Sequence, residues 1–405
     1  MSGISNVVDL LSPEFTQEPY AIYNDMRAEA PAHRVVVKTL TTELHAWVVT
    51  RYEAARSLLA DPRLSKDAAD LPRIVERNKV SAEPVQFANF KSMLFSDPPD
   101  HTRLRRIMGK AFTMRRVERL RPRIERATDE LLDRIVPGGD VDLVEALSLP
   151  LPITVIGELL GIPGDRRDDF RSWNATLTSV TATMQDKMQA HVAATAYLRD
   201  FIVDKRERPG DDLVSALLQA DDGEQGLDEG ELLSTIFLVM NAGYETTASM
   251  ISNSVYALLR DPEQQQRLRS QPQAVPAAVE EFLRFESPLN LATVRYTLEP
   301  VEIDGLTIPR DDLVFISLAA ANRDAARFSE PDALDTARSA NSHLAFGHGI
   351  HHCLGAPLAR MEGEIALSRL LARFPTWRLA VGEQSLRWRD SLQFRTLERL
   401  PVRLG

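Results

Sequence analysis

The chain has 405 residues, of which 44% are hydrophobic and 26% charged, a composition typical of a globular protein. Its formal net charge of −10 argues against general nucleic-acid binding. The most apolar stretch, 147–162, is interrupted by prolines and is too short to span a bilayer, and no basic segment followed by an apolar run begins the chain. We therefore expect a cytoplasmic protein without a membrane anchor.

Hydrophobic periodicity in the first third of the chain predicts a few short strands and then helices. Residues 35–37 and 46–50 predict a strand pair and 52–60 a helix, whereas 63–96, with its scattered prolines, predicts an irregular loop region. A helix is expected to begin at Asp100, where two prolines precede the first turn.

The rest of the chain is predicted to be mostly helical. Helical periodicity covers 115–136, 141–160, 165–180, 184–206, 227–260, 276–285 and 354–373. Strands are expected at 292–297, 301–303 and 313–316 and in the tail 376–402. Since no linker or repeat interrupts the chain, we expect one domain over residues 1–405, mainly α with small β-sheets (an α+β fold).

The single cysteine, Cys353, lies in Phe-Gly-His-Gly-Ile-His-His-Cys-Leu-Gly, residues 346–355. A lone thiol cannot form an internal disulfide, so it serves packing, nucleophilic chemistry or metal ligation. At the N-terminus of the helix predicted over 354–373 it is placed to be a thiolate, which can bind iron. Zinc is not expected, because Cys353 and its neighbouring histidines cannot all point at one tetrahedral centre.

A second unusual segment, Asn-Ala-Gly-Tyr-Glu-Thr-Thr at 241–247, lies inside the longest predicted helix. An interior glycine costs about 1 kcal/mol relative to alanine, and paired threonines restrict side-chain rotamers. The segment indicates either close helix packing at the glycine or a weakened turn beside a bound molecule.

Both segments resemble motifs of the cytochrome P-450 family, the haem-thiolate monooxygenases. Residues 346–355 match its haem-binding loop, Phe-Gly-x-Gly-x-His-x-Cys-x-Gly, and 242–247 match Ala-Gly-x-Asp/Glu-Thr-Thr. The resemblance, to the soluble bacterial type, extends from about residue 19 to the C-terminus. It implies the cytochrome P-450 fold, with a long central helix over the haem and the cysteine loop beneath it.

The resemblance also implies the roles of individual residues. Thr246 would hydrogen-bond dioxygen during its activation, and Glu245 would relay protons from solvent. Glu281 and Arg284, in a Glu-x-x-Arg motif, would join Arg338 in a structural cluster that braces the cysteine loop. Haem b (iron protoporphyrin IX) would take Cys353 as iron ligand. Its two carboxylates would contact His101, Arg105, Arg295 and His351, and the rest of the haem would contact Ala242, Gly243, Phe346, Gly347 and Gly355.

The substrate pocket implied by the resemblance is mostly apolar, with no obvious charged anchor. We therefore expect a hydrophobic small molecule, such as a polyketide, terpenoid or steroid, to be hydroxylated or epoxidised. Its expected lining residues are Phe87, Met93, Leu94, Thr178, Val239, Leu289, Ala292, Val294 and Phe394.

Two electrons from NAD(P)H must reach the haem through a ferredoxin or flavodoxin and its reductase. The chain contains no Gly-x-Gly-x-x-Gly nucleotide fingerprint, so no fused reductase is expected. Nine Arg or Lys residues and one acid between residues 103 and 123 form either a docking surface for an acidic partner or a solvated helix face.

Two other functions remain for the same fold. A peroxide-dependent peroxygenase would need no electron partner, but such relatives usually lose the pair present here as Glu245 and Thr246. A non-catalytic haem sensor or recruitment domain would need neither the proton relay nor, for recruitment, the cysteine.

Overall fold

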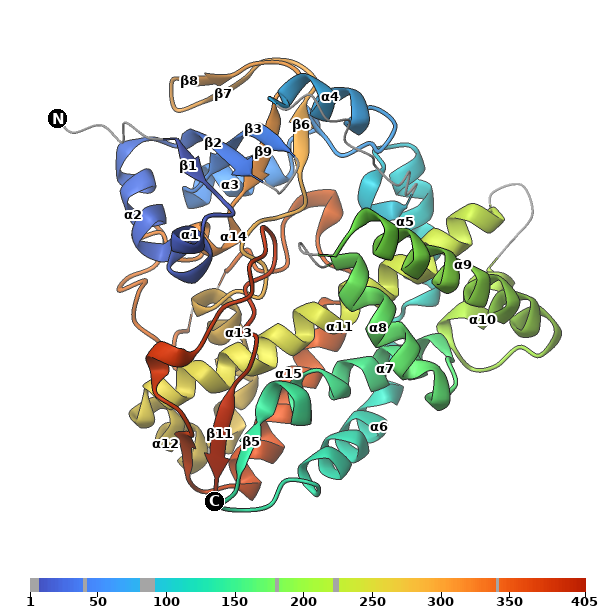
Figure 1. Ribbon diagram of the computed structural model, residues 1–405, viewed down its shortest axis with the longest axis vertical. Helices are drawn as coiled ribbons and strands as arrows, with labels where there is room; N and C mark the ends of the chain where they lie inside the picture. Colours follow the sequence, from blue (N-terminus) through green and yellow to red (C-terminus); the bar gives the residue numbers. More distant parts are fainter. Residues whose placement is uncertain (1–6, 39–41, 81–91, 179–181, 221–225, 340–341) are drawn as a thin grey trace.

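The longest element of the structure is helix α11, Glu229–Arg260, which crosses the centre of the molecule (Figure 1). The computed structural model describes residues 7–38, 42–80, 92–178, 182–220, 226–339 and 342–405. At 1.5 Å per residue, α11 is about 48 Å long. A capping box fixes its start, because the Asp228 and Glu231 side chains each accept a hydrogen bond from the other's backbone N–H.

The remaining helices surround α11 on several sides (Figure 1). The α-helices before it are α1 Pro13–Gln17, α2 Pro19–Glu29, α3 Tyr52–Leu59, α4 Leu71–Asn78, α5 Asp100–Ala111, α6 Met114–Leu132, α7 Pro150–Leu160, α8 Arg167–Thr178, α9 Met184–Glu207 and α10 Leu213–Gln219. Those after it are α12 Pro262–Ser270, α13 Val275–Phe285, α14 Leu318–Ala321 and α15 Ala356–Arg373. Short 3₁₀ turns are η1 Met93–Phe95, η3 Gly164–Arg166, η4 Pro272–Ala274, η5 Gly349–His351 and η6 Glu383–Ser385, and η2 Val144–Ser148 is a π-helical turn.

Small sheets complete the architecture. The largest has the strand order β1-β2-β3-β9-β6-β4 and lies beside α2 in the upper left of Figure 1. Its strands are β1 Val8–Asp9, β2 Ala32–Lys38, β3 Glu43–Val49, β4 Leu64–Ser65, β6 Arg295–Thr297 and β9 Leu313–Ile316. A second sheet has the order β10-β11-β5, with bounds Trp377–Leu379, Pro401–Leu404 and Asp140–Asp142, and β7 Val301–Ile303 pairs with β8 Leu306–Ile308.

The hydrophobic core consists of one large helical cluster and two smaller clusters on the sheet. Ile251 of α11, Leu151 of α7 and Leu370 of α15 are fully buried in the helical cluster, where each side chain contributes about 1.5–3 kcal/mol. Leu344 belongs to a sheet cluster and Ala345 to the helical one. The chain that enters the cysteine loop is therefore anchored in two cores at once.

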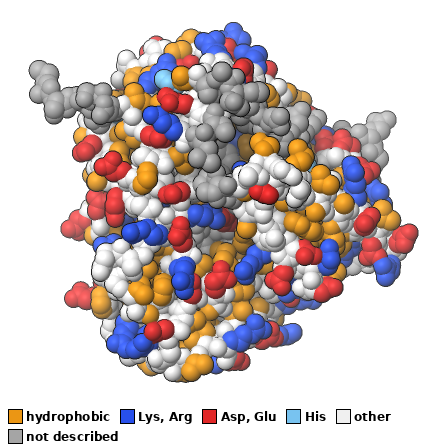
Figure 2. All heavy atoms as spheres, viewed as in Figure 1, with side chains coloured by type: hydrophobic (Ala, Val, Ile, Leu, Met, Phe, Trp, Pro, Cys, Tyr) orange, Lys and Arg blue, Asp and Glu red, His pale blue; other side chains and the backbone are white. Residues whose placement is uncertain are grey.

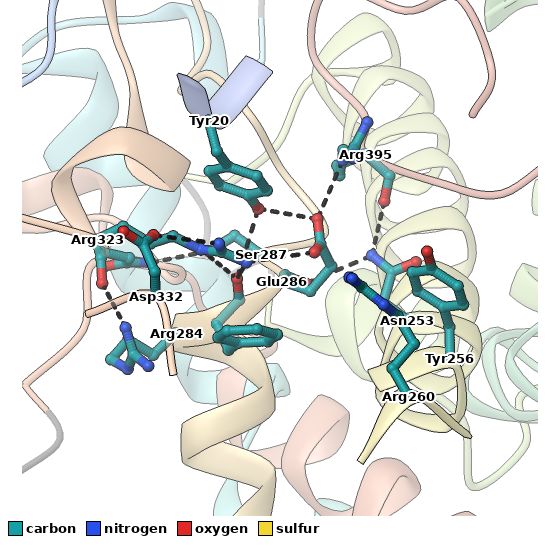
Figure 3. A network of polar contacts seen from close by, with 12 residues as sticks. Tyr20, Asn253, Tyr256, Arg260, Arg284, Glu286, Ser287, Arg323, Asp332 and Arg395 are labelled. Carbon is teal, nitrogen blue, oxygen red and sulfur yellow. Dashed lines mark hydrogen bonds and ion pairs between the residues drawn. The ribbon is translucent and has the colours of Figure 1, made fainter. Parts of the chain in front are cut away.

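A buried polar network ties the C-terminal segment to the start of the chain (Figure 3). Glu286, just after α13, accepts hydrogen bonds from Arg395 Nε at 3.0 Å and the Tyr20 hydroxyl at 2.8 Å, and pairs with Arg323 Nη2 at 3.4 Å. Arg395 also donates to two backbone carbonyls of α1. The network thereby holds residues 388–397 against the body of the protein.

The predicted elements differ from the observed ones in two regions. Residues 63–96, expected to be irregular, contain β4, α4 and η1 in their described part. The single helix expected over 141–160 is instead β5, η2 and α7, because Pro150 at the start of α7 cannot continue a helix from the preceding turn. Helices α1, α2, α10, α12 and α14 and strands β1 and β8 were also not predicted.

None of the helices in the described part of the chain is both long and apolar enough to cross a membrane.

Candidate active site

The cysteine loop connects Leu344 to α15 and is closed by backbone hydrogen bonds. Gly347 N donates to Leu344 O at 2.8 Å, and Cys353 N donates to Phe346 O at 2.9 Å. Cys353 is exposed in the structure, but desolvation by the surrounding protein raises the pKa of its thiol, whereas hydrogen bonds from the Gly355 and Ala356 backbone N–H groups lower it. N–H groups aimed at the sulfur favour its negative charge, so they suit a metal-bound thiolate.

Two glycines of this loop have backbone conformations that other residues rarely adopt. The φ angles of Gly347 and Gly349 are +71° and +76°. A Cβ atom on Gly349 would lie 2.9 Å from Ala60 Cα, at the end of α3. The close approach at Gly349 is therefore to the end of α3.

A group of basic side chains from several elements gathers beside the cysteine loop. His101 of α5 and His351 of the loop have ring centroids 4.3 Å apart. Burial, followed by the positive charges of Lys66, His101, Arg295 and Arg105, lowers the pKa of His351 to about 2. The residues predicted to bind the haem carboxylates thus meet, together with Lys66, which was not predicted.

Arg105 makes a contact within the protein that the sequence did not predict. Its Nη2 donates to the backbone carbonyl of His352 at 2.7 Å. Arg105 therefore supports the cysteine loop, and its predicted contact with a haem carboxylate stays a prediction.

The basic group fits a dianionic cofactor. His101 Nε2 and Arg295 Nε are buried and have no hydrogen-bond partner among the residues described. A buried donor left unpaired costs about 1–3 kcal/mol. Burial also lowers the pKa of Arg295 to about 10, with Asp97 and Asp61 only partly opposing it. The unpaired donors, the cations and the nearby thiol match the two carboxylates and the iron of haem.

Glu245 of α11 is buried and paired with Arg389 from the C-terminal segment. Its Oε1 accepts a hydrogen bond from Arg389 Nη2, while Oε2 is buried without a hydrogen-bond partner in the described part of the chain. Burial raises the pKa of Glu245, and the charge of Arg389 opposes this. A carboxyl whose ionisation is finely balanced suits proton transfer.

Thr246 is half-buried, and its hydroxyl donates to the Ala242 carbonyl at 2.7 Å. The α11 ribbon is helical from end to end, so the weakened turn considered for this segment does not appear as an interruption. A Cβ atom on Gly243 would lie 2.3 Å from Ile156 Cδ1 of α7. Close helix packing, the alternative left open by the sequence, is therefore observed at Gly243, where a larger residue would displace the Ile156 side chain.

The three residues predicted to brace the loop are in contact. Arg284 Nε and Nη2 each donate to the Glu281 carboxylate at 2.8 Å, and Arg338 Nε donates to it at 3.1 Å. Glu281 and Arg284 are completely buried. Arg284 also donates to the carbonyls of Asn322 and Pro331, so the cluster fixes the chain that leads to the cysteine loop.

Several predicted pocket residues lie at the borders of the core clusters. Leu289 and Phe394 form an isolated antiparallel bridge. Leu289 and Ala292 pack against one sheet cluster, Val294 against the other and Val239 against the helical cluster.

Of the four other predicted pocket residues, three precede α5 in the chain and Thr178 is the last residue of α8. Met93 is buried and Leu94 half-buried in η1. Phe87 and the side chain of Thr178 lie outside the described residues.

Zinc binding by Cys353 and the neighbouring histidines was the alternative weighed in the sequence analysis. In the described ranges, no group of three or more His, Cys, Asp or Glu side chains is arranged to hold a metal ion.

Comparison with known proteins identifies the family. The cytochrome P450 family model matches residues 163–385. Cytochrome P450 107B1 of Saccharopolyspora erythraea is 47% identical over 406 residues, which are 98% of each chain. The chain belongs to the cytochrome P450 family. The polyketide biosynthesis cytochrome P450 PksS of Bacillus subtilis is 38% identical over 394 residues, 97% of each chain.

A solved structure agrees with this assignment. The tirandamycin C-bound P450 monooxygenase TamI matches this P450 with a TM-score of 0.90 and 44% identity, over 97% of this chain and 99% of that chain. The predicted family, fold class and monooxygenase class are confirmed. Haem is the cofactor that the family implies, and the contacts assigned to individual site residues stay predictions.

Proposed function

We propose that this P450 hydroxylates or epoxidises a hydrophobic small molecule of secondary metabolism, using dioxygen and two electrons from NAD(P)H. The observation that carries the proposal is the set of unpaired buried donors, His101 Nε2 and Arg295 Nε, beside the loop of Cys353. Haem, when bound there, supplies the activation of dioxygen. The cytoplasmic location and the single domain over residues 1–405 stay predictions.

The residues of the chain would hold the cofactor and move protons. Cys353 would ligate the iron, and His101, Arg295 and His351 would contact the carboxylates. Glu245 has the burial and the charge partner expected of a proton relay, and Thr246, one residue later on α11, would pass the proton on.

An apolar polyketide is the substrate class that the comparisons favour. PksS is named for polyketide biosynthesis, and TamI was solved with tirandamycin C. The described candidates Leu289, Ala292, Val294 and Phe394 are apolar and half-buried, which suits a large hydrophobic molecule. A terpenoid or a steroid would meet the same surface.

The electron donor would be an external ferredoxin or flavodoxin with its reductase. Most arginines of the basic stretch 103–123 form ion pairs with acidic side chains, so fewer of its residues are available for the predicted docking of a partner. The ion pairs are Arg103–Glu231, Arg116–Asp211, Arg119–Asp211, Arg121–Glu364 and Arg123–Glu158.

Among the exposed basic residues of this stretch, Arg115 is the clearest candidate for docking. Arg106, Lys110 and Arg115 are exposed, and Arg115 has no acidic partner in the described part of the chain. On the face shown in Figure 2, acidic and basic side chains are interspersed, so that face presents no broad field of one sign.

The test is a panel of polyketide, terpenoid and steroid compounds added to the haem-loaded ferric protein. A substrate should shift the haem spin state, and a ferredoxin, its reductase and NADPH should convert it to an oxygenated product. Product formed only with hydrogen peroxide would instead support a peroxygenase. Haem without any product under either condition would support the sensor alternative.

A further inference from the structure

Lys66 lies next to Arg295 in the largest sheet. Strand β4 pairs antiparallel with β6, with Leu64 opposite Thr297 and Ser65 opposite Tyr296. Continuing this register by one residue sets Lys66 opposite Arg295. Directly opposed residues of an antiparallel pair have Cβ atoms about 4.5–5.5 Å apart on one face of the sheet. Two cations are therefore placed side by side.

The side chain of Lys66 is buried without a direct anionic partner among the residues described. Lys66 is 2% exposed, and its ammonium makes no hydrogen bond or ion pair with the residues described, although it lies 5.8 Å from the centre of the Phe95 ring. The nearby carboxylate of Asp97 instead accepts hydrogen bonds from the Ser65 hydroxyl and the Lys66 backbone N–H. Burial and the charge of Arg295 lower the pKa of Lys66 well below its ordinary range, and the charge of Asp97 opposes this only in part.

A buried ammonium next to a second cation is costly unless an anion neutralises both. The other groups whose charges reach Lys66 are His101 and His351, which belong to the candidate haem-carboxylate site. We propose that Lys66 is a further haem-binding residue, whose ammonium pairs with a haem propionate beside Arg295. This inference rests on the proposed haem-dependent function.

The test measures haem release from the ferric holoprotein to excess apomyoglobin. Lys66→Met and Lys66→Gln should each release haem at least about tenfold faster, because a hydrogen bond to a charged group contributes about 1.5–3 kcal/mol and 1.4 kcal/mol corresponds to tenfold. Lys66→Arg, which keeps the charge, should stay within about threefold of the wild type. The control is Lys38→Met in the same sheet, since Lys38 is exposed and pairs only at 3.9 Å with Glu43.

The haem reduction potential supplies a second readout. Loss of a cation beside the propionate disfavours adding an electron, so the potential should fall in Lys66→Met and recover in Lys66→Arg. Wild-type haem release and potential in either neutral variant would overturn the role of Lys66. Equal release by Lys66→Arg and Lys66→Met would also overturn it, because side-chain size rather than charge would then be the cause.

Other outcomes distinguish this proposal from its premise. If the wild type binds no haem through a thiolate, the proposed function fails and Lys66 fails with it. If haem release is unchanged but Lys66→Met weakens binding of carboxylate-bearing substrates, the buried ammonium recognises a substrate carboxylate, and the propionate assignment is wrong.

Discussion

Replacing Arg389 with methionine should move the pH dependence of turnover to higher pH. Arg389 is the charge partner of Glu245, and its positive charge opposes the rise in the pKa of Glu245 that burial causes. Without Arg389, that pKa should rise further. Whether the protonated or the ionised form of Glu245 is active, the limb of the profile that it governs should shift upward in pH.

The same change should affect stability in a pH-dependent way. A pair at about 4 Å with an effective dielectric constant of about 20 contributes about 4 kcal/mol. Since the side chain of Arg389 is 36% exposed, we discount this to roughly 1–2 kcal/mol. Because the folded-state pKa of Glu245 lies above its unfolded value, its stabilising contribution is complete below the unfolded pKa and is lost as pH rises through the folded pKa. Arg389→Met should thus unfold like the wild type at low pH and lose roughly 1–2 kcal/mol by pH 8.

The assay is the rate of substrate oxidation and the product formed per NADPH, measured across pH for the wild type, Arg389→Met and Glu245→Gln. Arg387→Met is the matched control, because Arg387 is exposed and donates only to backbone carbonyls. Glu245→Gln should remove the limb and slow turnover on the order of 100-fold. Superimposable profiles for Arg389→Met and the wild type, or a limb that persists in Glu245→Gln, would refute the reasoning.

Further predictions concern oxygen coupling, the tail network and partner docking. Thr246→Ala should leave haem and substrate binding intact and divert NADPH electrons to hydrogen peroxide, measured as peroxide per NADPH; unchanged coupling would exclude its role. Glu286→Gln should destabilise the holoprotein by about 3–5 kcal/mol in urea unfolding, because it leaves buried arginines uncompensated, and a loss under 1 kcal/mol would contradict this. Arg115→Glu should slow reduction by ferredoxin, whereas the control Arg310→Glu, far along the chain, should leave the rate of reduction unchanged. The wild-type rate of reduction should fall as salt rises past about 0.15 M. A rate that does not depend on salt would show that the basic stretch is a solvated helix face.

The sequence was most informative where chemistry is local. The loop around Cys353 and the contact between Glu281 and Arg284 follow from spacings of a few residues, and the structure shows both. The role of Gly243 could not be predicted from the sequence, because a glycine that leaves room for a ligand and one that leaves room for a neighbouring helix have the same sequence pattern. The position of Ile156 in the structure distinguishes the two.

The unpredicted features depend on residues far apart in the chain. Arg389 meets Glu245 across 144 positions, and no periodicity or motif signals such a pair. Lys66 lies in a segment expected to be loop, and only the pairing of β4 with β6 brings it beside Arg295. The acids that neutralise much of the basic stretch, such as Asp211, also come from distant elements.

The most direct test of the central claim is the spectrum of the reduced carbon monoxide complex of Cys353→Ala beside that of the wild type. The wild type should show the red-shifted Soret band that thiolate ligation produces, because the sulfur donates electron density to the iron. Cys353→Ala should lose that band while the unmutated carboxylate-binding residues still retain haem. A variant that binds haem and keeps the red-shifted band would contradict the assignment of Cys353 as the iron ligand.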